Sequence, residues 1–84
     1  MNNNLEKRII NLVNKISSLP EQDKKNIIEF AENNEWGIAL DTLCNQIYEY
    51  GIVITQSIYD EIVIIGNEME MEYSTWDFLE ELTK

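Results

Sequence analysis

The sequence predicts an all-α protein: a compact antiparallel bundle of four to five short helices that forms a single domain over residues 1–84. Apolar side chains recur at steps of three and four residues in the predicted helices, which is the period of a helix. Helix-starting and helix-stopping residues divide the chain into short pieces joined by short loops, which favours antiparallel neighbours. The chain has 84 residues and 44% of them are hydrophobic, enough for one core.

The first two predicted helices lie on either side of Pro20. One apolar face marks the first helix, and the Asn2–Asn4 run offers N-cap residues for it. Pro20 ends that segment and suits the first turn of the next helix, where Glu21 and Asp23 favour the positive end of the helix dipole. The side chains expected in the core are Leu5, Ile9, Leu12, Val13 and Ile16, followed by Ile27, Ile28, Phe30 and Ala31.

Asn33 and Asn34 form a natural break before a third predicted helix, which runs from Trp36 to Tyr50 and ends at Gly51. Its expected inward side chains are Trp36, Ala39, Leu40, Leu43, Ile47 and Tyr50. The next segment, Ile52-Val53-Ile54, is β-like in composition. It is only three residues long and has no evident partner strand, so we expect an extended connection that buries one or two side chains.

Thr55 is a good N-cap for a fourth helix, whose apolar stripe is formed by Ile58, Ile62, Ile65 and Met69. Because Val63, Ile64 and Gly66 flank the stripe, we expect this helix to be central in the bundle. Ser74 or Thr75 is expected to cap a short last helix that points Trp76, Leu79 and Leu82 inward.

Composition excludes several classes of function. There are 16 acidic and 6 basic side chains, a formal net charge of −10, which argues against binding nucleic acid or an anionic membrane. The absence of histidine removes the commonest general base and metal ligand. The single Cys44 is expected to be a buried thiol in a reducing compartment, the cytoplasm. We therefore expect no enzyme and no cofactor.

The negative charge is concentrated in the last two-thirds of the chain. Residues 1–25 hold five basic and three acidic side chains, whereas residues 26–84 hold thirteen acidic side chains and one basic one. Such a surface either keeps the protein soluble or binds a cationic partner. If the third and fourth helices pack side by side, their outward edges share one acidic strip that contains tyrosine. Together with two acids beyond the fourth helix, the candidate partner-binding residues are Asp41, Asn45, Tyr48, Glu49, Asp60, Glu61, Asn67, Glu68, Glu70 and Glu72.

Two simpler interpretations of the same residues stay open. The tyrosines (Tyr48, Tyr50, Tyr59 and Tyr73) would also suit the edge of a core, with their hydroxyls in water. Alternation of Glu68, Glu70 and Glu72 with methionines would suit weak binding of a divalent cation, although the glycine and oxygen pattern of a calcium loop is missing.

One pattern of residues covers about half the chain, between Trp36 and Leu79: Trp36-Gly-Ile-Ala-Leu-Asp-Thr-Leu-Cys44, Gln46-Ile-Tyr-Glu, Ile54-Thr-Gln-Ser-Ile-Tyr-Asp-Glu-Ile62, Met69, Met71 and Trp76. This stretch resembles the MafI family of small immunity proteins. Members of this family are antitoxins encoded beside polymorphic secreted toxins of bacteria, including contact-dependent growth-inhibition systems. The resemblance implies a cytoplasmic partner of a toxin's C-terminal domain, in a 1:1 heterodimer. It suggests a basic nuclease, first of all an EndoU-type ribonuclease. No motif fixes the family's toxin contacts, so it assigns no site residue.

The resemblance and the charge agree, because a ribonuclease site must be cationic to hold phosphates and an acidic helical protein can cover it. Charge alone would also suit an acidic mimic of nucleic acid that blocks a DNA- or RNA-binding protein of the host.

Overall fold

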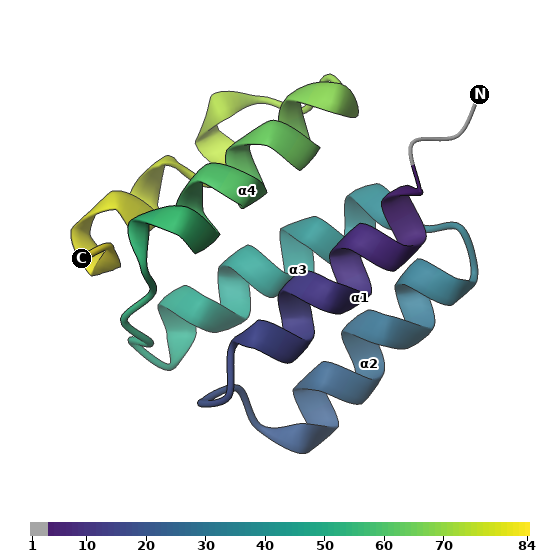
Figure 1. Ribbon diagram of the computed structural model, residues 1–84, viewed down its shortest axis with the longest axis horizontal. Helices are drawn as coiled ribbons and strands as arrows, with labels where there is room; N and C mark the ends of the chain where they lie inside the picture. Colours follow the sequence, from purple (N-terminus) through teal and green to yellow (C-terminus); the bar gives the residue numbers. More distant parts are fainter. Residues whose placement is uncertain (1–3) are drawn as a thin grey trace.

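The computed structural model describes residues 4–84 and contains four α-helices followed by two 3₁₀ segments in that range (Figure 1). Their bounds are α1 Leu5–Lys15, α2 Glu21–Glu32, α3 Trp36–Glu49, α4 Gln56–Glu68, η1 Tyr73–Thr75 and η2 Asp77–Leu82. The prediction of an all-α bundle is confirmed. None of the helices within this range is long and apolar enough to cross a membrane.

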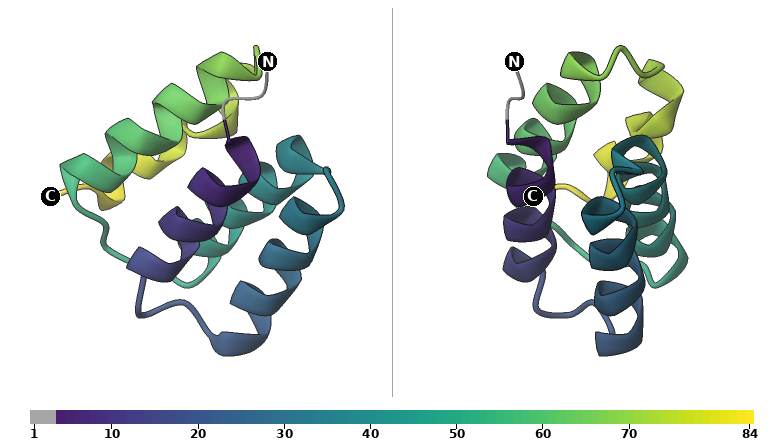
Figure 2. Two further views of the ribbon diagram at one scale, coloured as in Figure 1. Left: turned by 45° about the vertical axis from the view of Figure 1, so that its right-hand side comes forward. Right: turned by 90° about the vertical axis from the view of Figure 1, so that its right-hand side faces the viewer.

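The first three helices follow one another as antiparallel neighbours, and α4 lies across their upper side, next to α1 (Figure 1). The C-terminal segments turn back along α4, and η2 packs against α3 (Figure 2). Neighbouring helices enclose a single core that draws on every α-helix and on η2. The buried apolar residues include the predicted Ile9, Leu12, Val13, Ile27, Leu40, Leu43, Ile47, Ile62, Ile65, Trp76 and Leu79.

Three helices, α2, α3 and α4, end in the same backbone conformation, in which the residue after the C-cap has a positive φ angle. These residues are Asn34, Gly51 and Glu70, with φ of 64°, 60° and 58°. In each case the next N–H group bonds a carbonyl five residues earlier, as the Ile52 N–H bonds the Ile47 carbonyl at 2.9 Å. The predicted helix ends at Asn33-Asn34 and Gly51 are thereby confirmed.

The predicted helix starts are only partly right. Thr55 caps α4, since its hydroxyl oxygen accepts a hydrogen bond from the Ile58 N–H at 3.1 Å. Pro20 occupies the N-cap position of α2, one residue before the expected first turn. Neither Ser74 nor Thr75 caps the last segment with its side chain, so that prediction is wrong. Asn4 takes the N-cap position of α1, whereas Asn2 and Asn3 lie outside the described residues.

The last predicted helix is a pair of 3₁₀ turns instead. Trp76 and Leu79 are buried and Leu82 packs against the core, as expected. Their uniform spacing of three residues places them on one face of a 3₁₀ helix, which has three residues per turn.

The expected extended connection at residues 52–54 is confirmed, since no strand is assigned there and Ile52 and Ile54 are buried. A single parallel bridge joins Ile54 to Thr83, with hydrogen bonds of 3.0 Å to the Leu82 carbonyl and 2.9 Å from the Lys84 N–H. Two other expectations about packing are wrong. The fourth helix is not central: α4 lies at the edge of the bundle, and Ile64 is 53% exposed. Tyr50, expected inside, is also exposed.

Candidate protein-binding surface

On one flank of α4, the negative charge of its acidic side chains is neutralised by basic side chains of α1. Arg8 binds both carboxylate oxygens of Glu68 with two hydrogen bonds of 2.8 Å. About two helical turns away, the Lys15 ammonium binds Glu61 at 3.0 Å. The two pairs run in opposite sequence directions, so α1 and α4 are antiparallel. Two of the predicted partner-binding acids, Glu61 and Glu68, therefore hold α4 against the bundle.

The opposite flank of α4 borders an open groove of about 530 Å³, closed on its other side by η1 and the residue that follows it. The groove is largely apolar in its middle, where Ile64 is 53% exposed and Tyr73 is 59% exposed. Its complete lining is Tyr59, Asp60, Val63, Ile64, Asn67, Tyr73 and Trp76. Exposed apolar side chains with a polar border are typical of a protein-binding surface.

The floor of this groove depends on a glycine. A Cβ atom at Gly66 would overlap the six-membered ring of the Trp76 indole, so only glycine lets the indole lie this close to α4. The indole is 2% exposed, and Tyr73 meets it edge-on with ring centroids 6.4 Å apart. This contact holds Tyr73 at the rim of the groove.

Glu80 lies beside the groove, in a second hollow of about 390 Å³ that shares Tyr59 with it. The other residues that line this hollow are Gln56 and Thr83. The Oε2 atom of Glu80 accepts hydrogen bonds from the hydroxyls of both Tyr59, at 3.1 Å, and Tyr73, at 2.6 Å. Burial, followed by the bond to Glu80, raises the pKa of Tyr59 to about 12. The bond to Glu80 also raises the pKa of Tyr73, and the nearby charge of Asp77 acts in the same direction on both tyrosines.

The predicted residues of α3 lie on a different face. Asp41 and Asn45 are exposed one turn apart, and Glu49 is exposed at the end of the helix. Tyr48 packs edge-on against Phe78 of η2, with ring centroids 5.2 Å apart. The C-terminal segment thus covers one side of Tyr48 and lies along α3.

The ten predicted residues are therefore dispersed, and only Asp60 and Asn67 line the groove. Glu70 and Glu72 are exposed in the turn between α4 and η1. Sequence reasoning missed Glu80 and the exposed apolar pair Ile64 and Tyr73. The signal in the sequence is the excess of apolar residues beside the α4 stripe, which predicts a central helix and instead supplies the exposed side chains of the groove.

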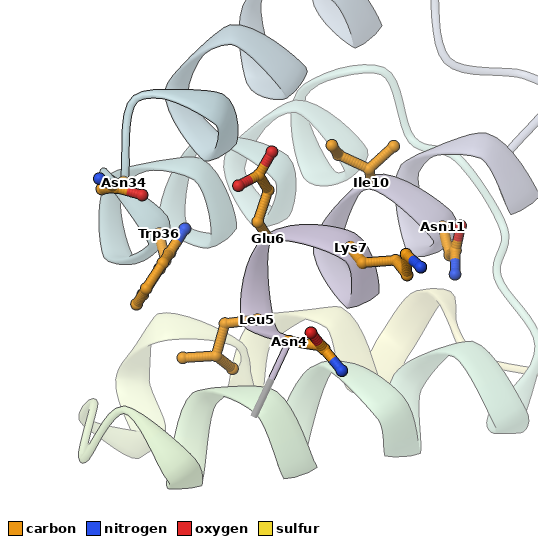
Figure 3. Close-up of a pocket in the computed structure, with 8 residues that line it drawn as sticks. All are labelled: Asn4, Leu5, Glu6, Lys7, Ile10, Asn11, Asn34 and Trp36. Carbon is orange, nitrogen blue, oxygen red and sulfur yellow. The ribbon is translucent and has the colours of Figure 1, made fainter. Parts of the chain in front are cut away.

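Two other hollows are weaker candidates. The larger, about 670 Å³, lies beside the start of α1, where Glu6 and Lys7 supply opposite charges (Figure 3). Trp36 also lines it and donates its indole N–H to the Ala31 carbonyl at 3.1 Å. The other, about 390 Å³, lies between α2 and α3. There the Asp23 carboxylate is occupied by hydrogen bonds from Gln46 and Tyr50 at 2.7 and 2.8 Å. Neither presents strongly exposed apolar side chains among its lining.

Two chemical possibilities can be judged from the geometry. Within residues 4–84, no three acidic, histidine or cysteine side chains are grouped so that they could hold a metal ion, and Glu68 is paired with Arg8. Cys44 is fully buried, and burial raises the pKa of its thiol to about 12, so the thiol stays protonated at neutral pH. Its predicted role as a small core residue is confirmed.

The chain matches no protein-family model, no curated protein and no solved structure. Its resemblance to MafI immunity proteins remains a prediction from the sequence.

Proposed function

We propose that this protein is an immunity protein that binds and neutralises a cognate secreted bacterial toxin by covering a cationic surface of its active site. The proposed partner is a basic nuclease, and an EndoU-type ribonuclease is the first candidate. The proposal rests on the resemblance of the stretch from Trp36 to Leu79 to MafI proteins, on the net charge of −10 and on the groove of α4.

The groove is the observation that carries the proposal. A stable interface usually has desolvated apolar or aromatic anchors at its centre and polar groups at its rim. Ile64 and Tyr73 supply exposed anchors, while Asp60 and Glu80 supply negative charge beside them. A surface kept acidic for solubility alone would not require these apolar side chains to be exposed.

The remaining charge has a kinetic role in this proposal. A toxin that degrades RNA must be captured before it acts, and opposite net charges raise association rates by about 10–10³ at low salt. The toxin would then be held in a 1:1 complex in the cytoplasm, where its substrate is excluded by occupancy of the active-site surface.

The test is co-expression with the toxin domain encoded beside this gene. We expect a complex that survives purification, growth of cells that carry both genes, and growth arrest of cells that carry the toxin alone. The control is a Leu43→Ala chain, which removes a fully buried side chain and should protect poorly. Neither complex nor protection would reject the proposal. Capture of a host DNA- or RNA-binding protein in its place would favour a nucleic-acid mimic.

A further inference from the structure

Glu80 is a carboxylate held in a fixed position. Two tyrosine hydroxyls bond the same oxygen, Oε2, and both tyrosines are themselves restrained: Tyr59 lies at the edge of the core and Tyr73 packs on Trp76. Within residues 4–84, the other oxygen, Oε1, has no hydrogen-bond partner. A carboxylate restrained in this way loses little conformational entropy when a further donor binds it.

The charge around Glu80 is not neutralised by the protein itself. The ion pairs of the described part of the chain use Glu21, Glu61 and Glu68. None of them involves Glu80, Asp77 or Asp60. Asp77 is close enough for its charge to raise the pKa of both tyrosines, and Asp60 lies at the same end of the groove as Tyr59. This end of the groove is therefore suited to a cation.

The apolar part of the groove is adjacent. Ile64 lies one turn along α4 from Asp60, about 5–6 Å away along the axis, and Tyr73 faces the same groove from η1. An occupant that satisfies both parts needs an apolar side chain and a cationic one, close together on the same segment.

We propose that the groove binds a segment of the toxin that places an aliphatic or aromatic side chain against Ile64 and Tyr73 and an arginine on Oε1 of Glu80. This assignment rests on the proposed function and specifies the partner's chemistry at that site. Arginine is favoured over lysine because its guanidinium can donate to Oε1 and at the same time stack on the exposed ring of Tyr73. A second copy of this chain is disfavoured, because it would bring two net charges of −10 together.

A pair of tetrapeptides tests the chemistry without the toxin. The ¹⁵N-labelled protein is titrated with acetyl-Leu-Ala-Ala-Arg-amide and with the same peptide carrying neutral citrulline in place of arginine. We expect saturable chemical-shift changes at the Trp76 indole N–H and at the amides of Ile64, Tyr73 and Glu80. Citrulline should weaken binding roughly tenfold, as expected for loss of a charge-assisted hydrogen bond. Equal binding of the two peptides, or shifts spread over all acidic residues, would overturn the assignment.

The matched variants are Glu80→Gln and Glu81→Gln, which remove the same charge from adjacent exposed positions. The glutamine oxygen at position 80 still accepts the tyrosine hydrogen bonds, so the fold should survive. We expect Glu80→Gln to lower the affinity for the arginine peptide about tenfold and to leave the affinity for the citrulline peptide unchanged. Glu81→Gln should leave both affinities within about twofold of wild type, as expected for loss of a screened surface charge. An equal loss in both variants would show that charge acts without a defined site.

The toxin complex separates this inference from the proposed function. If the wild-type protein binds the toxin and Glu80→Gln weakens the complex at least tenfold, both are supported. If Glu80→Gln and Ile64→Ser bind the toxin as wild type does, the groove assignment is wrong and the immunity function stands. If the wild-type protein binds no toxin, the function is rejected and the assignment of the groove to the toxin falls with it.

Discussion

Two regions of the molecule, the bundle of α1, α2 and α3 and the unit of α4, η1 and η2, both carry apolar residues at helical spacing. They differ in which of those residues they bury. In the first region, the predicted apolar stripes are buried or packed against the core except at Tyr50, which is 50% exposed. Two other side chains of α3, Ile38 and Tyr48, are 51% and 50% exposed. In the second, Ile64 and Tyr73 are left exposed beside Asp60 and Glu80, which form no ion pair within residues 4–84. Basic residues follow the same division, since five of the six lie in residues 1–25.

The difference shows how a helix can have apolar residues beyond those its fold requires. One face of α4 completes the core through Ile62 and Ile65, and one flank is fixed by α1 through two ion pairs. On the other flank, Val63 and Ile64 border the groove, and η1 on its far side leaves Ile64 exposed. Ile64 is therefore available for an interface without any loss of the protein's own core.

The largest expected effect separates the core from the groove. Leu43→Ala should destabilise the fold by about 2–5 kcal/mol, because the leucine is fully buried and the loss leaves a cavity. Ile64→Ala should change stability by about 1 kcal/mol or less, because the isoleucine is half exposed. Urea denaturation of the two variants measures the difference. Equal losses would show that the groove is part of the core.

A second contrast compares two glycines in helices. Gly66→Ala should cost about 1–3 kcal/mol, because the new methyl group overlaps the Trp76 ring and η1 must move. Gly37→Ala, at a helical position with open space around it, should stabilise by about 0.5–1 kcal/mol. Thermal melts should therefore shift in opposite directions. A Gly66→Ala melt at or above the wild-type temperature would contradict the close contact between α4 and the indole.

The helices were predictable because their periodicity and stop signals are local properties of the sequence. Periodicity identified the core positions from Ile9 to Leu79, and Gly51 identified the end of α3. The position of α4 depends instead on pairs distant in sequence, such as Arg8 with Glu68 and Ile54 with Thr83. No local pattern indicates them, so Glu61 and Glu68 were assigned to a partner surface although they bind α1.

Glu80 was missed for the same reason. Its role depends on Tyr59, 21 residues away, and on Tyr73 seven residues away. In the sequence it is one of sixteen acidic residues with no motif to distinguish it.

Glu70, in the turn between α4 and η1, tests a smaller effect, the cost of its backbone conformation. Its φ of 58° is a left-handed conformation, so Glu70→Gly should stabilise the fold by about 1 kcal/mol. The control is Glu72→Gly, at an extended position with φ of −72°, where glycine should lower stability by about 0.5 kcal/mol. Equal shifts in the two variants would show that backbone strain at position 70 is unimportant.

The two flanks of α4 should respond differently to salt. Glu68→Gln should lower the free energy of unfolding by about 0.5–1 kcal/mol at low ionic strength and by less at 1 M NaCl, because it weakens the bidentate pair with Arg8. Asp60→Asn, on the groove flank, should change stability by only a few tenths of a kcal/mol at either salt concentration. Denaturation at two salt concentrations gives both values, and a larger loss from Asp60→Asn would reverse the assignment of the flanks.

The last contrast appears only at alkaline pH. The folded protein holds the Tyr59 proton more tightly than the unfolded chain does, because the pKa rises from 10.0 to about 12. This contribution to stability is fully present below pH 10 and is lost as pH rises towards 12. Denaturation across this pH range should show that the free energy of unfolding declines less steeply with pH for Tyr59→Phe than for wild type. Identical slopes would mean that the Tyr59 proton is not held by burial and Glu80.

Hydrogen–deuterium exchange of the purified toxin complex locates the covered surface of this protein without any substitution. We predict slower exchange in residues 56–82, which form α4 and the C-terminal turns, and unchanged exchange in α1 and α2. Protection confined to α1 and α2, with residues 56–82 unchanged, would contradict the claim that the acidic, apolar-centred groove receives the toxin.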